Sequence, residues 1–216
     1  MHRFGALILA AVVTAATGTA LAVEVGETVP DVSFKDIRYL PRDLSELPEG
    51  KAYVLAFMTN TCPLAKRYLP KLVEMDEDYA DVTFAAVNIG PDETIRDVAW
   101  HALEYGVPFT MLKDMTGETA KDLGITRSPV ILLYDADRVL RYRGRVDDQY
   151  RLGRARPLPS RHDLREAIDE VLAGEEVSVP ETTPEGCALT IFDVPEPERE
   201  VTWAEDIAPI FARSCM

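Results

Sequence analysis

Cysteine is scarce in this chain of 216 residues, which contains only three: Cys62, Cys187 and Cys215. No two of them are close in the sequence, so the chain has neither a C-x-x-C dithiol nor the paired spacing of a zinc site. A local dithiol centre and a structural zinc centre are therefore both excluded.

Positive charge is also in short supply, since 23 Lys and Arg residues stand against 37 Asp and Glu residues and the net charge at pH 7 is -14. This balance argues against non-specific binding to nucleic acid or to an anionic membrane surface. With 47% hydrophobic residues, a chain of this length can bury one core of ordinary domain size. A second large domain is not expected.

The sequence lacks an apolar run long enough for a convincing membrane span. Residues 5–16 are small and apolar, follow a short basic start, and precede Ala20-Leu21-Ala22, whose small residues fit a signal-peptidase site. We therefore expect residues 1–22 to be a signal peptide that is cleaved after Ala22, with a retained anchor as the less favoured alternative. The mature protein is then periplasmic or otherwise exported, without membrane association, in an oxidising compartment where disulfides persist.

The organising feature of the chain is a cysteine placed directly after an apolar run. The run predicts a strand at Ala52–Met58, and a short polar turn then leads to Cys62 and to sequence compatible with a helix. Pro63 suits the first position of that helix. A cysteine in the first helical turn faces unpaired N–H groups and the positive end of the helix dipole, which favour the thiolate. Lys66 and Arg67 add positive charge, so Cys62 is the candidate nucleophile.

Strand-like and helix-like segments alternate up to residue 173. Further strands are expected at Asp81–Ile89, Phe109–Leu112, Val130–Tyr134 and Val139–Tyr142, and further helices at Glu93–Tyr105, Glu118–Leu123 and His162–Ala173. Residues 23–48 are expected to form a small hairpin or an irregular edge strand. This alternation predicts an α/β domain over residues 23–173, with a central mixed sheet covered by helices on both faces.

Eight arginines lie between Arg138 and Arg161 in an otherwise acidic chain. We expect an ordered, loop-rich connection there. The favoured interpretation is that these arginines pair locally with surface carboxylates, and the alternative is a site for an anion or a partner beside the thiol.

Two dipeptides that end in proline resemble sequence features of a known family. With Cys62-Pro63 at a helix start and Ser128-Pro129 directly before an apolar strand, residues 25–173 resemble the thioredoxin-like redoxins, which include thioredoxin-like and AhpC/TSA peroxiredoxin-like envelope proteins. The resemblance implies a thioredoxin-like fold and a thiol-dependent oxidoreductase acting on a peroxide or on protein thiols and disulfides. It also implies a cis bond before Pro129, in a loop beside the reactive cysteine.

The chain carries half of each family motif. Ala65 stands where thioredoxins have the second cysteine of C-x-x-C. Thr59, three residues before Cys62, matches a threonine or serine of peroxiredoxins, whereas Leu55 replaces their proline. Arg127 is the candidate for the arginine with which peroxiredoxins hold the thiolate and the peroxide. The substrate, peroxide or disulfide, therefore stays open.

A second thiol is needed if Cys62 cycles, because a sulfenic acid formed by peroxide must be resolved. Cys187 lies in a short apolar island within the acidic, proline-rich linker 174–200. It is the candidate resolving cysteine or the partner of Cys62 in a structural disulfide, with an unrelated free thiol as the alternative. A non-catalytic redoxin module that docks to or precedes a c-type cytochrome is the alternative to an enzyme.

Residues 201–216 resemble the helix that leads into the C-x-x-C-H haem-attachment site of c-type cytochromes. The segment ends at Cys215 and Met216, without the second cysteine and the histidine. We therefore expect neither haem nor another cofactor in this polypeptide. The likeness implies that the chain is the first part of a longer redoxin–cytochrome protein, and a plain amphipathic tail is the alternative. Copper delivery is disfavoured, because Lys66 stands where thioredoxin-fold metallochaperones need a second cysteine.

Overall fold

The computed structural model describes residues 23–189, 202–203, 208–209 and 212. The expected signal peptide, Cys215 and nearly all of the cytochrome-like segment lie outside the described residues. Within the described part of the chain, no helix combines the length and the apolar character needed to cross a bilayer.

A seven-stranded sheet forms the centre of the domain, with the strand order β2-β1-β5-β4-β3-β7-β8. Its strands are β1 Ser33–Asp36, β2 Pro41–Asp43, β3 Ala52–Met58, β4 Val82–Asn88, β5 Thr110–Lys113, β7 Val130–Asp135 and β8 Leu140–Gly144. The pairs β3–β4 and β4–β5 are parallel, and the other pairs are antiparallel. The predicted mixed sheet is confirmed, and the hairpin β1–β2 forms its edge.

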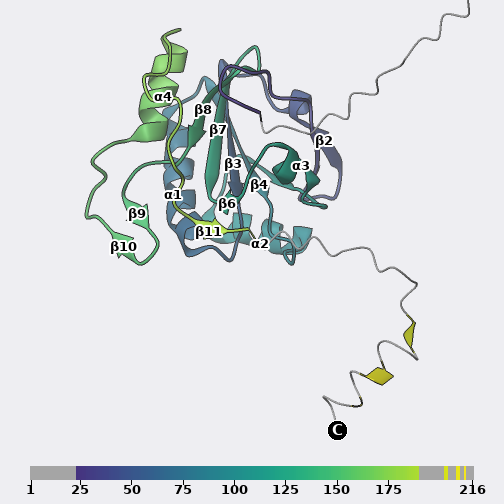
Figure 1. Ribbon diagram of the computed structural model, residues 1–216. Coiled ribbons are helices and arrows are strands. Elements are labelled where there is room, and N and C mark those ends of the chain that lie inside the picture. The colour runs from purple at the N-terminus through teal and green to yellow at the C-terminus, as the bar shows by residue number, and fades with distance from the viewer. Residues whose placement is uncertain (1–22, 190–201, 204–207, 210–211, 213–216) are drawn as a thin grey trace, which may run out of the picture.

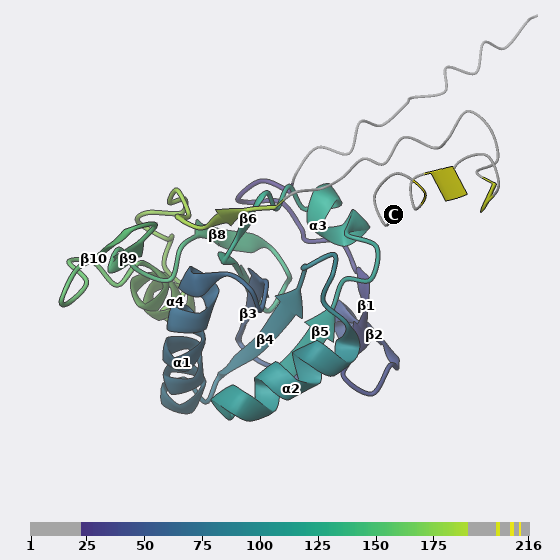
Figure 2. The same ribbon diagram turned by 90° about the horizontal axis from the view of Figure 1, so that it is seen from below.

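Helices cover both faces of the sheet, as expected. They are α1 Pro63–Asp78, α2 Ile95–Tyr105, α3 Glu118–Asp122 and α4 Asp163–Leu172. Buried side chains of α1, α2 and α4, such as Leu72, Val98 and Ile168, share one apolar cluster with alternate residues of the strands. Ala120 of α3 joins the N-terminal segment in the second cluster, on the opposite face. Figures 1 and 2 show α1 and α4 together on one side of the sheet and α3 on the other.

The second helix begins two residues later than the sequence predicts, at Ile95 instead of Glu93. Thr94 caps it, because the Asp97 N–H donates to Thr94 Oγ1 and the Thr94 N–H donates to Asp97 Oδ2. Gly106, at φ 60°, ends the helix in the left-handed conformation that glycine adopts at low cost. Glu93 consequently stays outside the helix and is available for other contacts.

The arginine-rich connection contains a short hairpin, β9 Tyr150–Arg151 and β10 Arg154–Ala155, that projects beside α1 (Figure 2). Most of its arginines form ion pairs, as the favoured interpretation expects, but two of the acids, Asp148 and Asp163, are buried and not on the surface. The pairs are Arg138 with Asp31, Arg141 with Asp135, Arg145 with Asp163, Arg156 with Asp148, and Arg161 with Asp163 and Glu166. Arg151 differs, because its partner is Glu185 of the linker.

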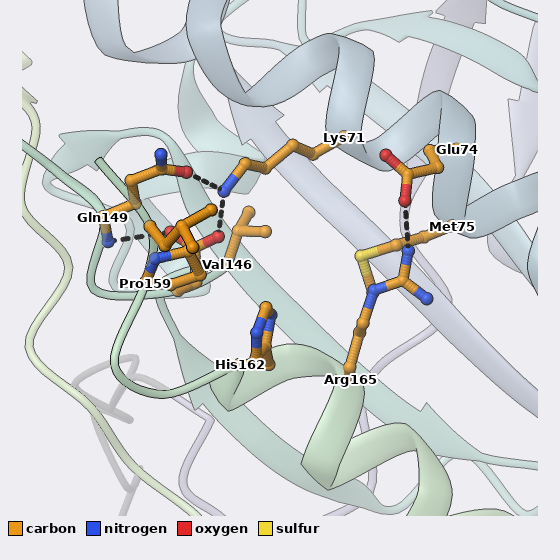
Figure 3. Close-up of a pocket in the computed structure, with 10 residues that line it drawn as sticks. Lys71, Glu74, Met75, Val146, Gln149, Pro159, His162 and Arg165 are labelled. Carbon is orange, nitrogen blue, oxygen red and sulfur yellow. Dashed lines mark hydrogen bonds and ion pairs between the residues drawn. The ribbon is translucent and has the colours of Figure 1, made fainter. Parts of the chain in front are cut away.

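A buried polar network fixes this connection to α1 around a cavity of about 210 Å³ (Figure 3). None of the predicted site residues lines the cavity. The Tyr68 hydroxyl donates to Asp147 and accepts from the Tyr150 N–H at 3.2 Å, and Lys71 binds both Asp147 and Gln149. The network holds the hairpin in place beside α1.

Replacing Tyr68 by phenylalanine is expected to lower the free energy of unfolding by about 1–3 kcal/mol, because buried partners lose their hydrogen bonds. Tyr79→Phe is the matched control, since its hydroxyl bonds Asp169 at an exposed position. Urea unfolding of both variants measures the difference. Equal losses in the two variants would contradict the role given to the network.

Candidate active site

The turn between β3 and α1 presents the predicted nucleophile. Cys62 is the N-cap residue of α1, and Pro63 occupies the first helical position, as the sequence predicts. The Cys62 N–H donates to the Thr59 carbonyl at 3.3 Å, and the Cys62 carbonyl accepts from the Lys66 N–H at 3.1 Å. The side chain is buried, with 1% of its surface exposed.

The proline loop lies against this thiol. The Ser128–Pro129 bond is cis, as the resemblance implies, and follows directly on the short strand β6, Arg127–Ser128. In its protonated form the Cys62 thiol donates to the Ser128 carbonyl at 3.1 Å. The two halves of the resemblance, the helix-start cysteine and the proline loop, therefore meet in space.

A strand from the linker closes the site. Residues Cys187–Ala188 form β11, which pairs antiparallel with β6 so that Cys187 lies opposite Ser128 (Figure 1). The two sulfur atoms of Cys62 and Cys187 are 2.7 Å apart, and both residues are free thiols. A disulfide has an S–S distance of about 2.05 Å, so a two-electron oxidant, such as a partner disulfide, can join the two sulfur atoms with only a small movement of the chain.

The linker is fixed to the sheet before it reaches the thiol (Figure 1). The Arg143 N–H donates to the Pro180 carbonyl at 2.9 Å, and the Thr182 N–H donates to the Arg143 carbonyl at 3.0 Å. The Thr182 hydroxyl also bonds the Tyr142 hydroxyl at 2.6 Å. The four residues 183–186 then span the gap to Cys187.

The two thiols have opposite pKa shifts. Burial raises the pKa of Cys62, but hydrogen bonding from Cys187 and the amides of Ala65 and Leu64 outweighs burial and lowers it. Burial and the neighbouring Cys62 raise the pKa of Cys187 to about 11. Cys62 is therefore the thiol of the pair that loses its proton first, and its thiolate then accepts a hydrogen bond from the Cys187 thiol.

Lys66 and Arg67 contribute less than the sequence suggests. Both side chains are exposed, and the Arg67 guanidinium lies over the Tyr150 ring, 5.3 Å from its centroid. The largest favourable contributions to the Cys62 thiolate come instead from the Cys187 thiol and the first-turn amides.

Thr59 and Arg127 do not form the contacts expected from peroxiredoxins. Thr59 donates to the Ser128 hydroxyl oxygen from its N–H at 2.8 Å and from its own hydroxyl at 3.3 Å. Arg127 donates from Nη1 to the Gly186 carbonyl at 3.2 Å. Thr59 thus supports the proline loop, and Arg127 holds the linker strand.

Glu93 is a site residue that the sequence interpretation missed. Its carboxylate accepts from the Asn60 N–H at 2.8 Å, the Thr61 N–H at 2.9 Å and the Asn88 side-chain amide. These bonds fix the turn that presents Cys62. The capping motif of Thr94 and the acid three residues later was the available signal, because it ends the helix before Glu93.

A small pocket of about 230 Å³ is lined by Cys187 together with Thr59, Glu93 and Leu189, and Cys62 is not part of its lining. Among the described residues, no cluster of three or more His, Cys, Asp or Glu side chains has an arrangement suited to a metal ion.

Cys187→Ala is expected to raise the pKa of Cys62, because the thiolate loses its hydrogen-bond donor. The thiolate fraction at neutral pH then falls and recovers at higher pH. Cys187→Ser keeps a donor and is expected to raise this pKa less. Ultraviolet absorbance of the thiolate against pH measures both midpoints, and identical midpoints in wild type and both variants would refute the assignment.

A helix-capping cysteine beside a cis-proline loop, on a mixed sheet with helices on both faces, defines a thioredoxin-like redoxin of the thiol oxidoreductase type. The chain belongs to the AhpC/TSA family, whose model matches residues 25–143.

Solved structures agree with this assignment. A hypothetical protein from Sinorhizobium meliloti 1021 is 30% identical, with a TM-score of 0.68 over 78% of this chain and 94% of that one. An uncharacterized conserved protein from Geobacillus kaustophilus is 27% identical, with a TM-score of 0.69 over 76% and 90%. Peroxidoxin BcpB from Mycobacterium tuberculosis is 19% identical, with a TM-score of 0.52 over 70% and 95%, and shares the fold. Curated protein sequences give no match.

Proposed function

We propose that this protein is a thiol–disulfide oxidoreductase that exchanges disulfides with partner proteins through Cys62 and Cys187. The observation that carries the proposal is the pairing of β11 with β6, which brings the two sulfur atoms to 2.7 Å. The opposite pKa shifts support a division of roles, with Cys62 as the attacking thiolate and Cys187 as the resolving thiol.

The reaction proceeds in two exchange steps. The Cys62 thiolate attacks one sulfur of the partner disulfide, forming a mixed disulfide and releasing the second partner sulfur as a thiolate. Cys187 loses its proton and attacks the Cys62 sulfur, which releases the first partner sulfur and forms the Cys62–Cys187 disulfide. The partner gains two electrons, and an external dithiol restores the reduced pair. The reverse sequence oxidises a partner dithiol.

Disulfide exchange is preferred to peroxide reduction because of what surrounds the thiol. Thr59 and Arg127, the residues that would hold a peroxide by analogy with peroxiredoxins, are bonded to Ser128 and Gly186. A second sulfur, in contrast, already lies next to Cys62. Export through residues 1–22 and a c-type cytochrome partner are further proposals that rest on the sequence.

Trapping tests the proposal. A Cys187→Ser variant is expected to accumulate a mixed disulfide with a reporter such as 5,5′-dithiobis(2-nitrobenzoate) or an oxidised peptide, because the resolving thiol is gone. Wild type is expected to pass to the Cys62–Cys187 disulfide, and Cys62→Ser is expected to form neither product. Mass spectrometry identifies the bonds, with Cys215→Ser as the control.

Three results would overturn the proposal. One is a Cys62–Cys187 bridge that resists mild dithiol reductants, which supports a non-catalytic module. Another is a Cys187→Ser variant that forms no mixed disulfide. The third is oxidation of Cys62 by hydrogen peroxide that outpaces its exchange with disulfides, which supports a peroxidase.

A further inference from the structure

The strand that covers Cys62 is the chain's own segment, and its contacts describe what the groove accepts. We infer that the groove binds a partner polypeptide as an extended strand with the sequence Glu-Gly-Cys, in the place of Glu185-Gly186-Cys187. This inference rests on the proposed function, because the partner cysteine is the sulfur that Cys62 attacks.

Backbone pairing fixes the register of any such strand. Cys187 lies opposite Ser128 and Ala188 opposite Arg127, and the Leu189 N–H donates to the Thr126 carbonyl at 2.9 Å. Side chains alternate between the two sides of a strand, so a shift by one residue would turn the cysteine away from Cys62. A partner cysteine therefore reaches Cys62 only in the register of Cys187.

The residue before the cysteine must be glycine in that register. A Cβ added to Gly186 would lie 2.1 Å from the Ser128 carbonyl oxygen and 2.7 Å from its carbonyl carbon. Both atoms belong to backbone next to the cis-proline, so they cannot turn aside as the end of a flexible side chain does. Any larger residue pushes the strand, and with it the cysteine, away from the proline loop.

The residue two places before the cysteine meets positive charge. Glu185 pairs with Arg151 of the hairpin at 3.3 Å. Next to this pair, a groove of about 390 Å³ runs along the start of α1, and its lining includes Arg67, Arg151 and Arg154. In a chain of net charge -14, three arginines on one groove select for an acidic residue at this position.

The linker strand and the partner compete for the same groove. The partner enters only when β11 leaves. Once the mixed disulfide has formed, the partner strand must unpair from β6 before β11 can return and bring Cys187 to the Cys62 sulfur. The bond changes are those of the two exchange steps. First, one partner sulfur bonds Cys62 while the second partner sulfur leaves as a thiolate. Cys187 then bonds Cys62 and displaces the first partner sulfur.

The test uses protein that carries Cys187→Ser and Cys215→Ser, so that Cys62 is its remaining cysteine, and a peptide, Thr-Pro-Glu-Gly-Cys-Ala-Leu, whose cysteine is linked to 2-nitro-5-thiobenzoate. Release of the coloured thiolate reports attack by Cys62. A peptide with alanine in place of glycine is expected to react about ten- to a hundredfold more slowly, which corresponds to the usual cost of overpacking. A peptide with lysine in place of glutamate is expected to react about two- to fivefold more slowly.

The decisive comparison reverses the charge of one arginine and measures the rates with the glutamate and lysine peptides. Arg151→Glu is expected to reverse the preference between the glutamate and lysine peptides. Arg141→Glu is the control, because Arg141 lies on β8 and is paired with Asp135, and it is expected to leave the preference unchanged. If all peptides react at equal rates while the protein still exchanges normally with 5,5′-dithiobis(2-nitrobenzoate), the inferred sequence preference is wrong and the proposed function still stands. Absence of exchange with that small disulfide would instead overturn the proposed function.

Discussion

Replacing Gly186 by alanine is expected to slow formation of the Cys62–Cys187 disulfide by about five- to a hundredfold, since overpacking of this kind costs about 1–3 kcal/mol. The added methyl group would lie 2.1 Å from the Ser128 carbonyl oxygen, so β11 cannot keep its place on β6. Loss of the strand removes the Cys187 hydrogen bond to Cys62 and opens the site. The domain itself is expected to stay folded, because β11 lies outside the seven-stranded sheet.

The measurement is the rate of intramolecular disulfide formation under a fixed glutathione ratio, followed by mass spectrometry. Ala188→Ser is the matched control, since this neighbour lies on the same strand with an exposed side chain. Gly186→Ala is also expected to expose Cys62 to external disulfides. Wild-type rates in this variant would mean that the strand does not bring the two cysteines together.

Removing the Glu93 carboxylate is the second change with a large expected effect. Glu93→Ala is expected to lower the free energy of unfolding by about 2–4 kcal/mol, because hydrogen bonds to a charged group contribute about 1.5–3 kcal/mol each and a buried partner is left unsatisfied. The affected groups are the N–H groups of Asn60 and Thr61 and the buried amide of Asn88. Cys62 should also react more slowly, because its turn is no longer held.

Two variants separate this role from a general effect of charge. Glu93→Gln keeps one acceptor oxygen and is expected to fall between wild type and Glu93→Ala, both in urea unfolding and in the rate at which Cys62 exchanges with a small disulfide. Asp92→Asn removes the same charge from the exposed neighbouring residue and is expected to change neither quantity. A loss in Asp92→Asn as large as that in Glu93→Ala would contradict the positioning role.

The features that the sequence predicted well are those determined locally. The run Ala52–Met58 is apolar throughout, and Pro63 marks the first turn of the helix, so the strand, Cys62 and α1 lie where the pattern puts them. The alternation of strands and helices likewise predicted the mixed sheet. The cis bond before Pro129 came from the family resemblance and not from any periodicity.

The features that the sequence left open depend on contacts between distant segments. Strand β11 has two residues, too few for a periodic pattern, and its position depends on pairing with β6, about 60 residues earlier in the chain. The sequence therefore kept resolving, structural and unrelated roles open for Cys187. Arg127 could be matched to a family position, but its bond to Gly186 depends on where the linker runs.

The attachment of Thr182 to Arg143 limits how far Cys187 travels when its strand is released. The five residues 183–187, the cysteine included, reach roughly 18 Å at full extension. A thiol confined to such a radius has a local concentration of the order of millimolar or higher. External thiols in solution therefore compete with the chain's own sulfur for a newly formed mixed disulfide only when they are present above that concentration.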